Sequence, residues 1–139
     1  MDYFLVKSEP SAYSWQQFIK DKRTEWTGVR NYAARLHLRS MKIGDLVLFY
    51  HSNEGKDVVG IAKVVKEAYQ DRTTKEDWSA VDLAPEKTLK RSVSLEEIKK
   101  DKRLKNIPLV RIPRLSVMPV SKAEFDAIME LSGKSGFTH

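Results

Sequence analysis

Two apolar segments joined by a short polar loop restrict the fold of this chain more than any other feature of its sequence. The first, Leu46 to Tyr50, is apolar at every position, which is typical of a strand that is buried on both faces. The second, Asp57 to Tyr69, is rich in β-branched residues that favour strands, and Gly60 within it indicates a bulge or a close approach of another group. The intervening Asn53 to Gly55 predicts a hairpin loop between the two strands.

Three further segments have the features of strands. DYFLVKSEP is apolar and aromatic and ends at Pro10, which also holds Glu9 in an extended conformation. WSAVDLAP predicts a strand that stops at Pro85. RLSVMPV predicts a last short strand, with Leu115 and Val117 on the same side.

Four segments have the features of helices. In three of them a serine precedes a Gln or Glu by three residues, a pattern in which each side chain caps the backbone N–H of the other residue. The fourth, Asn31 to Met41, repeats apolar and basic residues with the helical period, so one row should face the core and the other the solvent or a phosphate. The capping pairs are Ser14 with Gln17, Ser94 with Glu97 and Ser121 with Glu124, and the two rows are Ala34, Leu38, Met41 and Arg35, Arg39, Lys42.

The order of these elements predicts a single α+β domain over residues 1–139. Helices stand before, between and after the strands without βαβ alternation, which excludes a doubly wound parallel sheet and leaves an α+β sheet or a small β-barrel with helices around it. A length of 139 residues suits one hydrophobic core. Gly133 is expected to end the last helix, and the residues after about 132 are expected to form a C-terminal tail.

The composition excludes several classes of protein. The chain has no cysteine, which rules out a disulfide framework, cysteine-bound zinc and a thiol nucleophile. The N-terminus carries an acid where a signal peptide needs a base, and no apolar run is longer than Leu46 to Tyr50. We therefore expect no membrane span and a soluble intracellular protein, cytoplasmic or, in a eukaryote, nuclear.

The basic residues are concentrated in two segments. The net charge of +6 attracts polyanions, although many basic proteins bind no nucleic acid. Arg30 to Lys42 contains no acid, and Lys99 to Arg114 holds seven bases against the single acid Asp101. The two segments either flank a common groove for phosphates or are two solvated faces. The candidates for phosphate binding are Arg35, Arg39, Lys42, Lys99, Lys100, Lys102, Arg103, Lys105 and Arg111.

Sequence signatures of enzymes and metal sites are missing. His37, His51 and His139 are isolated from one another, so no short-spaced metal pair exists. SGKSG near the C-terminus resembles the end of a phosphate-binding loop, but Ile128 stands where that motif needs a glycine. No metal and no cofactor is expected, although a catalytic triad can be assembled in space without a sequence motif.

Polar and aromatic residues gather where the predicted strands end, which is where a rigid scaffold presents binding groups. Trp26 offers a flat face on which a base can stack. Ser8, Asn31 and Ser52 carry donors and acceptors that can read a base edge, and Arg30 can hold a phosphate or an edge. Each residue also has a structural alternative, since Trp26 could belong to the core and Asn31 could cap a helix.

The motifs YFLVKSEPSAYSW, WTGVRNYAARLHLRSMKIGDLVLFYHSN, VVGIAKVVKEAYQD and RLSVMPVS resemble those of the EVE domain, a member of the PUA-like superfamily. The similarity runs from Tyr3 to about Leu131. It implies a mixed β pseudo-barrel with peripheral helices, and a non-catalytic module that recognises a modified base of DNA or RNA. Carried over by motif, it places these residues at a base-binding pocket: Lys7, Ser8, Glu9, Trp26, Val29, Arg30, Asn31, Tyr50, His51, Ser52, Asn53, Arg114 and Ser116.

The leading hypothesis is therefore a module that holds a flipped base on Trp26, with DNA or RNA carrying a modified base as its partner. One alternative is an enzyme that acts on nucleic acid or modified nucleotides, with Glu9 or His51 as the general base. Another is a protein-interaction domain whose basic surface is incidental. The sequence leaves the choice between DNA and RNA, and the identity of the modification, open.

Overall fold

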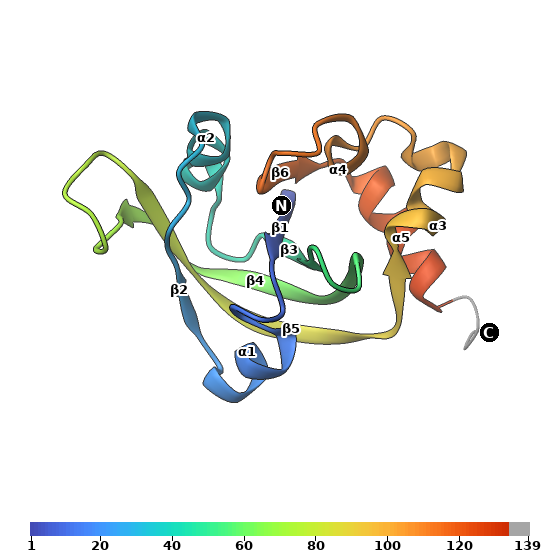
Figure 1. Ribbon diagram of the computed structural model, residues 1–139, viewed down its shortest axis with the longest axis horizontal. Helices are drawn as coiled ribbons and strands as arrows, with labels where there is room; N and C mark the ends of the chain where they lie inside the picture. The colour runs from blue at the N-terminus through green and yellow to red at the C-terminus, as the bar shows by residue number, and fades with distance from the viewer. Residues whose placement is uncertain (134–139) are drawn as a thin grey trace.

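The computed structural model describes residues 1–133 as one mixed β-sheet with helices around it, so the predicted tail, including His139, lies outside the described residues (Figure 1). In the sheet the strand order is β2-β5-β4-β3-β1-β6. The strands are β1 (Tyr3–Ser8), β2 (Thr24–Trp26), β3 (Leu46–His51), β4 (Asp57–Gln70), β5 (Ser79–Ser94) and β6 (Val117–Val120). The helices are α1 (Trp15–Asp21), α2 (Tyr32–Ser40), α3 (Leu95–Lys100), the 3-10 helix η1 (Lys102–Leu104), α4 (Pro108–Arg111) and α5 (Lys122–Gly133).

The predicted hairpin lies at the centre of the sheet. β3 and β4 pair in antiparallel fashion, and four consecutive residues of β3, Val47 to Tyr50, are buried. β5 continues the antiparallel arrangement beyond β4. On the other side of β3, β1 pairs with it in parallel and carries β6 as its antiparallel neighbour. The segments before and after the hairpin therefore return to the same sheet, which a simple meander would not allow.

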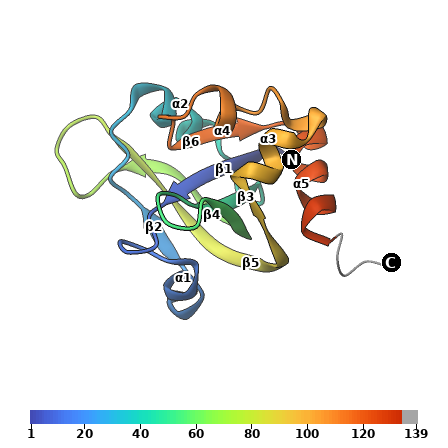
Figure 2. The same ribbon diagram turned by 45° about the vertical axis from the view of Figure 1, so that its right-hand side comes forward.

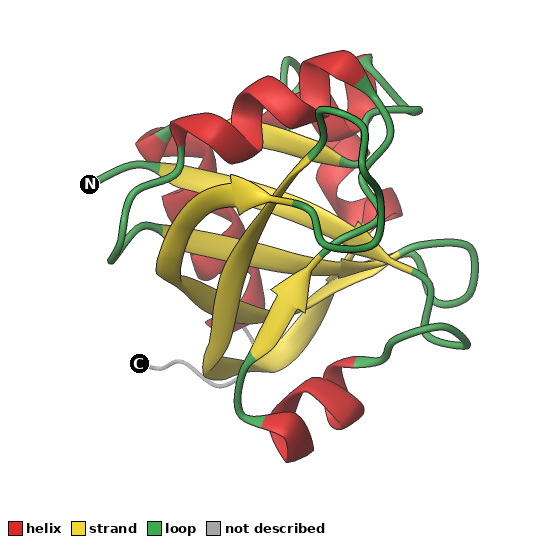
Figure 3. Cartoon of the chain, turned by 90° about the vertical axis from the view of Figure 1, so that its left-hand side faces the viewer, coloured by secondary structure: helices red, strands yellow, loops and turns green. Residues whose placement is uncertain are grey.

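The sheet curls into an incompletely closed barrel, because its two longest strands bend (Figure 3). Four register shifts interrupt the pairing of β4 with β5, and each lets the strands change direction without losing their ladder. Pro85 lies beside one of them: it pairs with Ala62, next to the shift between Ile61 and Ala62. The prediction that Pro85 ends a strand was wrong, since a proline at such an irregularity costs no ladder hydrogen bond and β5 continues for nine residues to Ser94.

Gly60 is a site of close approach, as its position within a strand predicted. A Cβ atom added to Gly60 would lie 2.3 Å from Cζ2 of Trp15, well inside the contact limit. The strand register also shifts between Val58 and Gly60. The indole of Trp15 therefore packs directly on the backbone of β4, and this contact fixes α1 against the barrel.

The predicted helix starts are confirmed by their capping bonds. The Ser14 hydroxyl accepts from the Gln17 amide, and Ser94 forms a reciprocal capping box with Glu97. Ser121 and Glu124 make the same two bonds at the start of α5. The described part of α5 reaches Gly133, the last described residue, so the expected helix end there is not observed.

α2 has the apolar face that its period predicted, whereas Arg35 and Arg39 of the basic row bond to Asp77 and Ser79. Ala34, Leu38 and Met41 are buried in the core. Its first residue follows Asn31, whose side chain accepts from the Ala34 amide and caps the helix. β2, η1 and α4 are short and were not predicted, and Leu115 precedes β6, which begins only at Val117.

The helices surround the barrel unevenly. α1 lies below the sheet in Figure 1 and α2 lies above it, while α3 and α5 lie together at the end of the molecule opposite β2 (Figures 1 and 2). No helix within residues 1–133 is both long and apolar enough to cross a membrane. This arrangement is the predicted α+β fold, with the ends of β1 and β2 exposed between α1 and α2.

Candidate functional site

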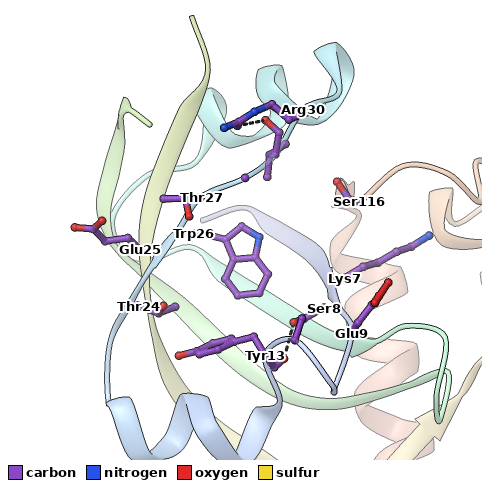
Figure 4. Close-up of a pocket in the computed structure, with 13 residues that line it drawn as sticks. Lys7, Ser8, Glu9, Tyr13, Thr24, Glu25, Trp26, Thr27, Arg30 and Ser116 are labelled. Carbon is purple, nitrogen blue, oxygen red and sulfur yellow. Dashed lines mark hydrogen bonds between the residues drawn. The ribbon is translucent and has the colours of Figure 1, made fainter. Parts of the chain in front are cut away.

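A cavity of about 410 Å³ opens where β1 ends, facing β2 and the loop that connects β2 to α2 (Figure 4). Its size lies within the range of pockets that bind small molecules. Seven residues of the predicted pocket line it: Lys7, Ser8, Glu9, Trp26, Val29, Arg30 and Ser116. The motifs at the end of β1, after β2 and before β6 thus meet around one hollow, although they are far apart in the sequence.

Trp26 stands in the middle of this cavity and is only partly buried. Its ring meets Phe49 at 5.7 Å and Tyr13 at 6.3 Å between centroids, both in edge-to-face geometry. Phe49 in turn stacks on Phe18 at 5.4 Å. A continuous aromatic column therefore supports the indole from the core, so its position is fixed before any ligand arrives.

The opposite wall is polar. Ser116 faces the nitrogen-bearing ring of Trp26 in Figure 4, and its carbonyl accepts from the Lys7 amide at 3.0 Å. The Lys7 ammonium donates to the carbonyl of Pro113 at 2.6 Å, which ties the end of β1 to the loop before β6. Burial lowers the pKa of Lys7. The Ser8 hydroxyl donates to the Tyr13 carbonyl at 2.5 Å.

The loop between β2 and α2 is held by one fully buried carboxylate. Asp71 accepts from the Gly28 amide at 2.8 Å and from the Arg30 guanidinium at 3.0 Å. Burial alone would raise the pKa of Asp71, but the hydrogen bonds from Thr73, Gly28 and Arg30 outweigh it and hold the pKa well below its ordinary value. Gly28 has φ +83°, a backbone conformation that favours glycine. The sharp turn after Trp26 therefore depends on both the glycine and the buried charge.

Arg30 contributes to the wall of the cavity but directs its guanidinium away from the indole (Figure 4). Besides Asp71, the guanidinium donates to the Thr73 hydroxyl at 3.1 Å. About two-fifths of the Arg30 side chain is exposed (39%), so the cation lies at the rim and remains accessible to an anion.

Six residues of the predicted pocket do not line the cavity. Asn31 caps α2, and Tyr50 is buried in the barrel, where burial and the nearby Asp57 raise its pKa. Ser52 bonds through its amide to the Ser8 carbonyl. The remaining three are His51, Asn53 and Arg114, of which Arg114 is exposed between α4 and β6.

His51 and Asn53 bond to neighbouring residues and do not enter the cavity. Nε2 of His51 accepts from the Trp15 amide at 3.1 Å, which holds the first residue of α1. Burial lowers the pKa of His51, partly offset by Asp57, and the neutral ring is the form that can accept this bond. Asn53 donates to the Glu9 carboxylate at 2.8 Å. Asn53 therefore supports a residue of the cavity wall, whereas His51 holds a helix that does not line the cavity.

The predicted phosphate-binding residues fall into separate regions of the surface. Arg35 donates to the Asp77 carbonyl and Arg39 to the Ser79 hydroxyl and the Asp77 carboxylate, so both tie α2 to the β4–β5 connection. Arg103 pairs with Asp101 and Glu130. The other candidates are exposed: Lys42, Lys99, Lys100, Lys102, Lys105 and Arg111. Their role toward phosphate stays a prediction.

Sequence reasoning missed six residues of the cavity wall: Ala12, Tyr13, Thr24, Glu25, Thr27 and Gly28. Thr24 and Glu25 belong to β2, whose three residues are too few to give a periodic signal. Tyr13 could have been suspected, because it is an aromatic residue in the short turn between β1 and α1.

A second cavity of about 570 Å³ lies beside the N-terminus and the start of α5. Two of the polar side chains that line it are engaged within the helix: Ser121 caps α5, and Lys122 pairs with Asp126 at 2.8 Å. No group of three or more His, Asp or Glu side chains within residues 1–133 is arranged to hold a metal ion. Residues of the predicted pocket line the cavity around Trp26 and none lines the second cavity, so the former is the candidate site.

The fold and this cavity define a small PUA-like α+β domain with one aromatic-walled hollow at the strand ends. The chain belongs to the EVE domain family, whose model matches residues 2–131. It is 38% identical over 165 aligned positions to mouse (Mus musculus) thymocyte nuclear protein 1, covering 94% of this chain and 73% of that protein.

Solved structures agree with this assignment. A protein of Agrobacterium tumefaciens has 42% identity and a TM-score of 0.93, with 96% of this chain and 94% of the other covered. Human THYN1 protein, solved in complex with 5-methylcytosine-containing DNA, has 34% identity and a TM-score of 0.87, with 95% and 98% covered. ASCH from Zymomonas mobilis, at 12% identity and a TM-score of 0.60 over 94% and 95% of the chains, shares the fold alone.

Proposed function

We propose that this protein is a non-catalytic reader of modified DNA that holds an extruded base, 5-methylcytosine or a similar modified base, in the cavity beside Trp26. The observation that carries the proposal is the indole itself, which is supported from the core by Phe49 and open toward a polar wall. The complex of human THYN1 protein with 5-methylcytosine-containing DNA supports DNA as the partner. A DNA reader of this kind acts in the cytoplasm of a bacterium or in the nucleus of a eukaryote.

Stacking alone offsets only part of the free energy that extruding a base costs. Extruding a base from a duplex costs a few kcal/mol, and stacking on an aromatic side chain returns about 1–3 kcal/mol. The remainder must come from hydrogen bonds to the base edge and from contacts to phosphates. In this cavity Ser116 faces the indole from the opposite wall, and the Arg30 cation lies at the rim.

Two contacts support a binding role over a catalytic one. The sequence offered Glu9 and His51 as general bases. Nε2 of His51 is occupied by the Trp15 amide, and Glu9 is exposed and held by Asn53. A general base needs a lone pair directed at the proton that it removes. The Nε2 lone pair of His51 instead accepts a hydrogen bond from the Trp15 amide.

Replacing Trp26 tests the proposal. We expect Trp26→Ala to bring the affinities for DNA with 5-methylcytosine and with cytosine within about twofold of each other, because the stacking surface is lost. Trp26→Phe, which keeps a ring, should retain most of the discrimination. The two affinities are measured by fluorescence anisotropy on matched duplexes, with circular dichroism to confirm folding. Leu36→Ala, at an exposed position of α2, serves as the control.

A second variant tests the cavity without disturbing the aromatic column. Ser116→Phe should fill the hollow from the opposite wall and abolish discrimination while Trp26 remains in place. If both folded variants still discriminate, the modified base binds elsewhere. Mass spectrometry of the recovered DNA separates reader from enzyme, since a reader leaves the oligonucleotide intact.

A further inference from the structure

Beside the cavity, on the outer side of the loop that connects β2 to α2, two aromatic rings and two guanidinium groups form one cluster. The ring of Tyr32 stacks on that of Trp78 with centroids 5.3 Å apart and an angle of 28°. Cζ of Arg35 lies 4.9 Å from the Tyr32 centroid and 5.1 Å from that of Trp78. Cζ of Arg30 lies 5.7 Å from the Trp78 centroid. We call Tyr32, Trp78, Arg30 and Arg35 the aromatic shelf.

The outer ring of the shelf faces solvent. Tyr32 is 69% exposed although it already touches Trp78 and Arg35, so much of the ring surface remains open. A large exposed aromatic ring adds little to a hydrophobic core, and the tie between α2 and the β4–β5 connection is made by Arg35 and Arg39 through Asp77. Structural support alone therefore does not account for the exposed tyrosine.

The shelf is continuous with the cavity through Arg30. This residue lines the cavity, reaches over Trp78 and is separated from Tyr32 by the helix cap Asn31 alone. The fully buried Asp71 holds both the Arg30 guanidinium and the Gly28 amide. The wall of the cavity and the shelf are thus fixed to each other by the same carboxylate.

The chemistry of the shelf fits a nucleic acid. An aromatic face is a sequence-tolerant platform for a base, because every base has a π-face. The neighbouring guanidinium groups favour an anionic polymer and can hold a phosphate oxygen. A strand that places one base in the cavity must lead its adjacent nucleotides across the rim, where Arg30 and Tyr32 lie.

We propose that Tyr32 stacks against the nucleotide adjacent to the extruded base in the same DNA strand, with Arg30 beside its phosphate. This inference rests on the proposed function, since it takes the cavity as the place of the extruded base. It assigns to the shelf a contact that adds affinity without reading the modification. Trp26 and Tyr32 should therefore affect binding in different ways.

The test compares Tyr32→Ala with Tyr32→Phe on DNA carrying either 5-methylcytosine or cytosine. We expect Tyr32→Ala to weaken binding of both probes by the same factor, about 5- to 150-fold, which corresponds to the loss of one stacked base. The ratio between the two probes should stay as in the wild type. Tyr32→Phe keeps the ring and should bind within about threefold of the wild type. Leu36→Ala, exposed on the same helix, is the matched control.

Probes that lack one base identify the partner of Tyr32. Each probe carries 5-methylcytosine with an abasic site on its 5′ or its 3′ side. One of the two should weaken wild-type binding as much as Tyr32→Ala does, and the same probe should weaken Tyr32→Ala little further, because the interaction is already absent.

Three results would overturn the proposal. In the first, Tyr32→Ala binds both probes as tightly as the wild type. In the second, Tyr32→Phe loses as much affinity as Tyr32→Ala. In the third, the loss caused by Tyr32→Ala adds in full to the loss caused by each of the two abasic probes. Failure of the proposed function gives a different pattern: Trp26→Ala keeps the preference for 5-methylcytosine, whatever Tyr32→Ala does. The failure of the Tyr32 contact can therefore be distinguished from the failure of the proposed function.

Discussion

At the scale of single residues, Gly60 has the least room for a side chain of the described glycines, because Trp15 packs against it. Gly60→Ala would place a methyl group within 2.5 Å of three ring atoms of a buried indole whose nitrogen donates to Thr88. Because the ring is held by that bond, it cannot move aside freely. We expect a loss of about 2–3 kcal/mol in the free energy of unfolding, the upper part of the range for overpacked cores, measured by urea denaturation.

The control for this substitution is Gly133→Ala in α5, where no atom of the described residues 1–133 lies within 4 Å of the added atom. Alanine is the better helix residue, so this variant should be as stable as the wild type or more stable by up to about 1 kcal/mol. A fully stable Gly60→Ala variant would show that α1 can shift away from β4.

The sequence predicted which motifs form the pocket, but it did not show which side chains within each motif point into the cavity. Trp26, Lys7 and Ser116 were predicted at the pocket and do line it. Tyr50 and Asn31 belong to the same motifs but face the core or cap a helix. In a strand buried on both faces, alternation no longer tells which side chain points to a ligand.

At the scale of elements, the strongly patterned segments were predictable and the short ones were not. The β3–β4 hairpin and the capped starts of α1, α3 and α5 follow from local sequence. β2 has three residues and exists because it pairs with β5, a long-range contact that leaves no local pattern. β5 continues past Pro85 because its partner strand allows a register shift there.

The connection between β2 and α2 depends on the charge of Asp71, which predicts a pH-dependent stability. The folded-state pKa of Asp71 lies below its ordinary value of 3.8, so its contribution is complete above that pH and is lost as the pH falls toward the folded-state pKa. We expect Asp71→Asn to lose about 2–4 kcal/mol of unfolding free energy at pH 7, since it removes the buried negative charge and replaces one of the two oxygens that accept from Gly28, Arg30 and Thr73 with an NH₂ donor.

Measuring the unfolding free energies of wild type and Asp71→Asn again at pH 3 separates the contribution of the Asp71 charge from that of its packing. The difference in unfolding free energy between wild type and Asp71→Asn should shrink there, because at pH 3 the Asp71 carboxyl of the unfolded chain takes up a proton while the folded carboxylate stays ionised, which lowers the stability of the wild type. Urea unfolding followed by circular dichroism at the two pH values measures it. A difference of equal size at both values would mean that the carboxylate acts through its shape alone.

At the scale of the whole molecule, the basic surface is divided between two ends. α2 and the β4–β5 connection lie at the end that carries the cavity, and α3 lies at the opposite end beside α5 (Figure 1). The sequence showed two basic segments but could not show this separation, which depends on how β5 crosses the sheet. Of the second segment, Arg114 comes nearest in sequence to the cavity, two residues before Ser116.

This division predicts which cations contribute to the salt dependence of DNA binding. The plot of log K against log salt concentration has a negative slope, and the magnitude of this slope decreases by about 0.9 for each phosphate contact that is removed. Arg114 is exposed, and Lys7 anchors the neighbouring Pro113 to the cavity wall, so Arg114→Gln should reduce the slope by about one contact on a short duplex with a central 5-methylcytosine. The double variant Lys99→Gln/Lys100→Gln removes two exposed charges from α3 and should leave the slope unchanged, because α3 lies at the end of the molecule opposite the cavity. A reduced slope in the double variant, measured by anisotropy titrations between about 50 and 200 mM salt, would instead show that the DNA crosses α4 and runs the length of the molecule.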